Sequence, residues 1–268
     1  MKKGSFAGLL YREFYLGRQS YVINFITFMC FAAMGWLALL SINHGNFSLL
    51  FDDTADSGSG ILKDKETVNL LRTVILSGIK FMPLVMAGMI VFSTVDVSAK
   101  DTLNSWIRFE HCTPVTPIRY ALVKTVSTAI WAAVSFALLL SYMFSVTAAL
   151  DDKFTYGDFS LIVLFLAGLT ILSILCQIFI TLFHSRDKGM VVLMLIILPS
   201  VIIISGTGAM KEKEKNGIEP DDPLGIGMIM SLFTGKAQAL FPIMLLVLVG
   251  SFVLMFVSMY LIYKRREK

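Results

Sequence analysis

The stretch "FSLIVLFLAGLTILSILCQIFITLF", residues 159–183, contains no charged residue and no proline. An α-helix rises about 1.5 Å per residue, so this stretch is long enough to cross the roughly 30 Å hydrocarbon core of a bilayer. Its apolar residues are continuous and do not alternate with polar ones. The pattern therefore favours a membrane-spanning helix over a strand of a membrane β-barrel.

Five further runs of the same kind occur in the chain. They lie at about 21–42, 73–95, 120–146, 190–208 and 239–263. The whole composition agrees, with 56% hydrophobic and 16% charged residues and a mean hydropathy of +0.75, whereas soluble domains carry about 25% charged residues. The sequence predicts one all-α integral membrane domain over residues 1–268, with six transmembrane helices and no nucleotide-binding domain.

Lysine and arginine residues gather on one side of this arrangement. The segments on the side of the N-terminus hold fourteen of the twenty-three basic residues, whereas the opposite loops hold eight and carry thirteen of the nineteen acidic residues. Cytoplasmic loops have an excess of Lys and Arg. We therefore expect both termini to be cytoplasmic.

Residues 4–19, "GSFAGLLYREFYLGRQ", precede the first predicted span. Arg12 and Arg18 fall mainly outside the face on which the large apolar residues gather. Those apolar residues are Phe6, Leu9, Leu10 and Phe14. The pattern predicts a helix lying in the membrane interface; the alternative is a basic flank that only sets the topology.

A short apolar segment precedes the last span. "PLGIGMIMSLF", residues 223–233, is too short to cross the bilayer. It is therefore expected either to enter the membrane and return or to lie at the outer interface.

Lys80 is the one formal charge deep inside a predicted span, and a lysine at the bilayer centre costs roughly 2.5–3.5 kcal/mol. Two interpretations are open. Lys80 lines a substrate path, with Pro83 bending the helix one turn later, or its side chain extends to the outer surface, since Arg72 lies only eight residues before it.

Motifs for chemistry are missing from the sequence. The nearest approach to a phosphate-binding loop is "FTGKAQ", in which Ala237 follows Lys236, and there is no Gly-X-Ser-X-Gly, His-Glu-X-X-His or Cys-X-X-Cys. We expect no catalytic residue, no metal site and no cofactor in this chain, which by itself would not be an enzyme.

The longest predicted cytoplasmic connection, 96–119, is not a plain charge run. "DTLNSWIRFEH", residues 101–111, can form a short helix with Trp106 and Phe109 on one side, and Pro114 and Pro117 end it. A rigid aromatic projection suits docking into a partner's groove. The alternative is a loop folded against the membrane, with Trp106 at the lipid interface.

This connection resembles the ABC type-2 exporter permeases. The matching residues are Asp101, Trp106, Phe109, Pro114, Val115, Tyr120 and Lys124. The resemblance extends to the interfacial N-terminal helix, the six spans, the short second cytoplasmic loop "HSRDKG" and the apolar segment before the last helix. The chain departs from many relatives in lacking a basic residue directly after the Pro-Val pair, since Arg119 comes later.

The resemblance implies a plasma-membrane permease subunit that pairs with a second permease copy or paralogue and with two separate ATP-binding subunits. Those partners would bind ATP and Mg²⁺, and no nucleic-acid partner is expected. Residues 104–112 would form a coupling helix that docks on the ATPase. The contact candidates are Asn104, Trp106, Arg108, Phe109, Glu110 and Cys112. The implied cargo is an amphipathic peptide or a hydrophobic compound.

Two other classes of function stay open. An ATP-independent secondary transporter or channel would need intramembrane carboxylates or a paired half-repeat, and the spans contain no Asp or Glu before Asp96 at a boundary. A membrane receptor or immunity scaffold that transports nothing is the other alternative.

Overall fold

The computed structural model describes residues 6–43, 65–103, 115–149, 156–196 and 226–266. They form five long helices and a further helical segment at 186–196, and there is no strand among them. The five helices are α1 (Phe6–Asn43), α3 (Lys65–Leu103), α5 (Pro117–Ala149), α6 (Tyr156–Phe183) and α8 (Ile226–Arg266). The all-α prediction is confirmed for these parts of the chain.

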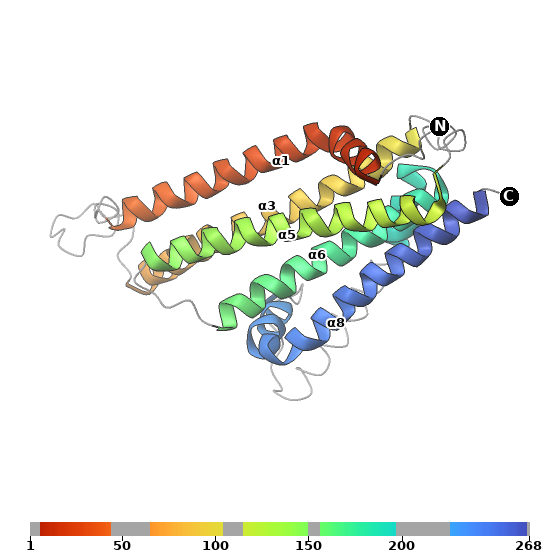
Figure 1. Ribbon diagram of the computed structural model, residues 1–268. Coiled ribbons are helices and arrows are strands. Elements are labelled where there is room, and N and C mark those ends of the chain that lie inside the picture. Colours follow the sequence, from red (N-terminus) through yellow and green to blue (C-terminus); the bar gives the residue numbers. More distant parts are fainter. Residues whose placement is uncertain (1–5, 44–64, 104–114, 150–155, 197–225, 267–268) are drawn as a thin grey trace, which may run out of the picture.

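The helices lie side by side in one elongated bundle (Figure 1). α1 lies at one edge, α8 at the other, and α3, α5 and α6 lie between them. We call the end of the bundle at which α1 and α5 begin, and at which α3, α6 and α8 end, the proximal end. The opposite end is the distal end. Both chain ends of the described bundle are therefore on the same side.

Five helices within the described ranges are long and apolar enough to cross a membrane. Their candidate spans are Phe6–Leu40, Pro83–Thr102, Pro117–Ala149, Ile162–Phe183 and Phe241–Arg265. This composition identifies a multi-pass membrane protein. Of the sixth predicted span, 190–208, residues 190–196 belong to the helical segment 186–196 and the remainder lies outside the described residues.

Several helices are longer than the spans predicted from hydropathy. α1 includes both the N-terminal segment and the first span, and its first turns bend away from the rest (Figure 1). α3 extends beyond both ends of the predicted second span, 73–95. The described part of the short outer segment, 226–233, forms the start of α8, at an angle to the main part of that helix. Pro83 and Pro242 lie inside α3 and α8, where each removes a backbone hydrogen bond.

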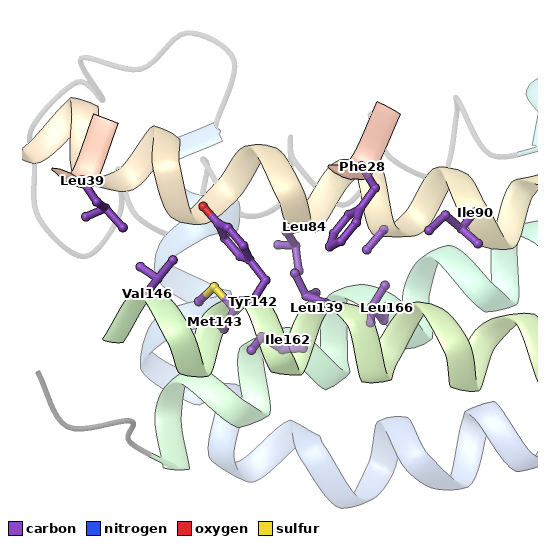
Figure 2. Packing of buried hydrophobic residues seen from close by; sticks show 11 residues of the cluster. Phe28, Leu39, Leu84, Ile90, Leu139, Tyr142, Met143, Val146, Ile162 and Leu166 are labelled. Atoms are coloured by element: carbon purple, nitrogen blue, oxygen red, sulfur yellow. The ribbon is translucent and has the colours of Figure 1, made fainter. Parts of the chain in front are cut away.

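An apolar core fills the bundle from its middle towards the distal end (Figure 2). Phe28, Leu84 and Leu139, from three different helices, are at most 3% exposed. Because lipid tails are as apolar as these side chains, the core stabilises a membrane-spanning bundle mainly through close van der Waals packing. A smaller cluster at the proximal end includes Tyr120 of α5 and Met259 of α8.

A tight turn joins α6 to the helical segment 186–196. His184 has a left-handed backbone, with φ of 54°, which is the conformation that commonly ends a helix at the residue after its last turn. The Gly189 amide then donates to the Ser185 carbonyl at 3.0 Å. A Cβ at Gly189 would lie 2.9 Å from the Ile180 backbone, so the missing side chain permits this close approach. Of the predicted short loop "HSRDKG", only His184 and Ser185 connect the two helices, because residues 186–189 already belong to the helical segment.

Candidate functional site

Four charged side chains meet at the proximal end, where α1, α3 and α5 come together. The Lys124 ammonium of α5 donates to Glu13 Oε2 of α1 at 2.8 Å and also contacts Asp101 Oδ2 of α3. Asp101 Oδ1 accepts from the Arg12 guanidinium of α1 at 2.7 Å. We call Arg12, Glu13, Asp101 and Lys124 the ion cluster. It contains two positive and two negative groups and therefore carries no net charge.

The ion cluster is withdrawn from solvent. The side chains of Glu13, Asp101 and Lys124 are only 4–5% exposed, and that of Arg12 is 20% exposed. Burying charges is expensive, and the cost is offset only when each charge keeps close, hydrogen-bonded partners. Removing one partner leaves a buried charge uncompensated. The three helix ends are therefore held together by groups that depend on one another.

Further contacts fix the same end of the bundle. The Lys100 ammonium donates to the Leu16 carbonyl at 3.1 Å, which is a second link from α3 to α1. Asp96 Oδ1 lies 3.7 Å from the Arg186 guanidinium of the segment 186–196. That pair is half-exposed, so it contributes at most about 1 kcal/mol.

The structure brings together the two charged ends of the motif that carries the family resemblance. Asp101 precedes the segment 104–114 and Lys124 follows it, and the two side chains are in contact. Tyr120 is buried and stacks on Tyr263 of α8, with ring centroids 5.3 Å apart. Val115 packs against the same cluster. Both flanks of the segment are thus anchored inside the bundle.

The predicted coupling residues themselves lie outside the described residues. They are Asn104, Trp106, Arg108, Phe109, Glu110 and Cys112. For Lys80 the structure gives only its position in the backbone of α3, three residues before Pro83. Whether its side chain lines a path or extends to the surface stays a prediction.

The predicted interfacial residues divide between the bundle and the surface. Leu9 packs against the proximal apolar cluster, and Phe14 makes an edge contact with Trp131 at 5.7 Å between centroids. Leu10 is half-buried, whereas Phe6 is exposed. Arg12, which the sequence pattern directed away from the apolar face, turns towards Asp101.

Glu13 is the site residue that sequence reasoning missed. It lies in a short segment with basic residues on both sides, and Lys124 lies in a charge-poor span that supplies no acid of its own. An acid and a base in such settings at the same membrane face are candidates for pairing. Glu13 and Lys124 are 111 residues apart in the sequence, so no local sequence pattern predicts their contact.

A second polar cluster lies between α3, α5 and α6. The Gln177 amide donates to Thr94 Oγ1 at 2.9 Å and to Thr128 Oγ1 at 3.2 Å, and it accepts from Ser98 Oγ at 3.3 Å. Ser173 Oγ lies 3.1 Å from Thr94 Oγ1. All five side chains are buried and hydrogen-bonded. Such contacts connect membrane helices without placing a free charge among them.

Gln177→Leu should lower the free energy of unfolding by about 0.6–2 kcal/mol, a range typical of hydrogen bonds between membrane helices. The loss is limited because the Thr94 and Thr128 hydroxyls also donate to carbonyls of their own helices. Thermal unfolding in detergent micelles measures the change. The control is Gln19→Leu, at an exposed position of α1, which should change stability by less than about 0.5 kcal/mol.

Within the described ranges, no group of three or more His, Cys, Asp or Glu side chains is placed to hold a metal ion. Within the part of the chain that the structure describes, the ion cluster links α1, α3 and α5. Comparisons with protein-family models, curated proteins and solved structures found no match. What is established is the class: an all-helical, multi-pass membrane protein.

Proposed function

We propose that this chain is the transmembrane permease subunit of an ATP-driven ABC exporter. The observation that carries the proposal is the buried contact between Asp101 and Lys124, which joins the two flanks of the segment predicted to couple to the ATPase. The family resemblance of that segment, from Asp101 to Lys124, supports the same conclusion.

The ion cluster is suited to transmitting the movement of a partner subunit, docked outside the membrane, to the membrane helices. Residues 104–114 lie between α3 and α5 in the sequence. Because α3 and α5 are linked to each other and to α1, a displacement of the intervening segment acts on three helices together. Closely packed elements move as units and do not deform locally. Movement of a docked partner would therefore reach the spans.

The energy source in this proposal is a separate subunit. The sequence has no phosphate-binding loop, so ATP and Mg²⁺ would bind to the partner, and positioning and charge stabilisation would accelerate hydrolysis there. The proximal end would face the cytoplasm, in agreement with the excess of basic residues on that side. The cargo class is an amphipathic peptide or a hydrophobic compound.

Purification of the tagged chain from its native host should recover a stoichiometric ATP-binding subunit, identified by mass spectrometry. The purified complex, reconstituted in lipid vesicles, should hydrolyse ATP faster in the presence of its cargo. A screen of amphipathic peptides, hydrophobic drugs and lipids measures this stimulation. The control is the complex with a catalytically inactive ATPase subunit.

Two results would contradict the proposal. Recovery of the intact, folded chain without any ATP-binding protein would remove the partner. Solute flux through the purified chain alone, driven by an ion gradient and indifferent to ATP, would instead support the secondary transporter or channel.

A further inference from the structure

The contact between α1 and α5, which we call the α1–α5 seam, changes character along its length. At the proximal end it holds the ion cluster, and towards the distal end it is filled by apolar side chains such as Phe28 and Leu139. Between these two parts lie three polar side chains: Tyr21, Trp131 and Ser135.

Each of the three places a buried polar atom where no hydrogen-bond partner is found among the described residues. The atoms are the Tyr21 hydroxyl oxygen, Trp131 Nε1 and Ser135 Oγ. Tyr21 is 4% exposed and Ser135 is 0% exposed. The Tyr21 hydroxyl is near Ser127 and Trp131, but neither contact has the geometry of a hydrogen bond. Leaving buried polar atoms unsatisfied is costly, so most such atoms in proteins bind either protein groups or ordered water.

Ser135 differs from three other hydroxyl residues of its helix. Thr125, Thr128 and Ser141 each donate to the carbonyl one turn back in α5, at 2.8–3.0 Å. Such a bond is the usual way in which a helix satisfies a hydroxyl within a membrane. Ser135 Oγ does not make it, although it is fully buried. Its hydroxyl is available to a group that occupies the interior.

The three side chains follow the ion cluster along the α1–α5 seam. The Tyr21 and Trp131 rings are stacked, with centroids 3.8 Å apart. Residues four apart share one face of a helix, so Ser135 follows Trp131 along α5, and Ser127 precedes it on the side of Lys124. One turn beyond Ser135, Leu139 is fully buried in the apolar core (Figure 2).

We propose that the α1–α5 seam binds ordered water from the ion cluster as far as Ser135, and that the layer of Phe28 and Leu139 excludes water beyond it. The chemistry of the three groups fits water. Trp131 Nε1 only donates, whereas the Tyr21 and Ser135 hydroxyls both donate and accept. One water molecule can accept from the indole and donate to a hydroxyl, which gives it the two to four partners that buried water requires. This inference holds whether or not an ATPase drives the chain.

Thiol labelling tests the proposal in lipid nanodiscs, where both faces of the full-length chain are accessible. Ser135→Cys and Leu139→Cys are compared in a chain whose Cys30, Cys112 and Cys176 are replaced by alanine. A small, water-soluble methanethiosulfonate cation reacts only with a thiolate, which forms in water and is suppressed in an apolar setting. Ser135→Cys should therefore react at least about tenfold faster than Leu139→Cys. Equal, slow rates at the two positions would overturn the proposal, and labelling after denaturation confirms that both thiols are present.

A second measurement needs no substitution. Hydroxyl radicals generated from water by X-rays oxidise side chains that lie beside bound water. Trp131 and Trp36 both pack partly buried against the apolar core, but of the two only Trp131 has a buried nitrogen without a partner among the described residues, so Trp131 should be oxidised faster. Oxidation of Trp131 no faster than that of Trp36 would also overturn the proposal. This comparison decides the matter if Ser135→Cys fails to fold.

Discussion

Lys124→Met is expected to lower the free energy of unfolding by about 3–5 kcal/mol. The substitution keeps much of the length of the side chain but removes the ammonium that contacts both Glu13 and Asp101. Two carboxylates, each about 5% exposed, then lose their shared cation. Arg12 still pairs with Asp101, so Glu13 bears most of the penalty. Thermal or denaturant unfolding of the purified chain in micelles measures the loss.

Two companion variants separate charge from packing. Lys264→Met removes an exposed lysine, whose ammonium lies 5.5 Å from the Tyr260 ring centroid, and should cost no more than about 1 kcal/mol. Glu13→Gln combined with Lys124→Met should recover much of the stability, because Arg12 and Asp101 still pair and the uncompensated Glu13 charge is removed. Equal stability of Lys124→Met and Lys264→Met would show that the ion cluster does not hold the helices together.

Gly189→Ala should lower the free energy of unfolding by about 1–3 kcal/mol, the usual cost of overpacking. A Cβ at this position would lie 2.9 Å from Cα and N of Ile180 and 3.0 Å from the Phe179 carbonyl carbon. These are backbone atoms of α6, so no side-chain rotation can relieve the contact. The helical segment 186–196 would have to move away from α6. Thermal unfolding measures the effect.

Gly250→Ala is the matched control, because a Cβ there meets nothing within 4 Å among the described residues. Alanine is favoured over glycine inside a helix by about 1 kcal/mol in water, so this variant should be as stable as the wild type or slightly more stable. If both alanine variants change stability equally, the close approach of the segment 186–196 to α6 is wrong.

The parts of the fold that sequence predicts well are those set by uninterrupted hydropathy. The span 159–183 corresponds closely to α6, Tyr156–Phe183, because no charge interrupts it. The ends of the first two spans were less predictable. Their hydropathy falls near Arg12, Glu13 and Asp101, yet α1 and α3 continue through these residues because the charges pair with partners on other helices.

The candidate site shows the same limit. The motif that carries the family resemblance includes Asp101 and Lys124, but it does not predict that these two side chains contact each other or that Lys124 also binds Glu13. The role of Lys124 depends on an acid in α1 and another in α3, which only the packing of three helices brings together. Likewise, no sequence pattern distinguishes Ser135, whose hydroxyl is directed inward, from Ser141, which bonds its own helix.

The retention of an ATP-binding subunit by the double variant Trp106→Ala, Phe109→Ala tests the central claim most directly. If these aromatic residues fill the ATPase groove, they are interface hot spots, and their loss should weaken binding by at least about thirtyfold, equivalent to 2 kcal/mol. The matched control is Phe47→Ala with Phe51→Ala, in the loop predicted to face outward, which should retain the partner fully. We expect the ATP-binding subunit to be lost from the Trp106 and Phe109 double variant alone. Its full retention by this variant, with the chain folded, would contradict the account.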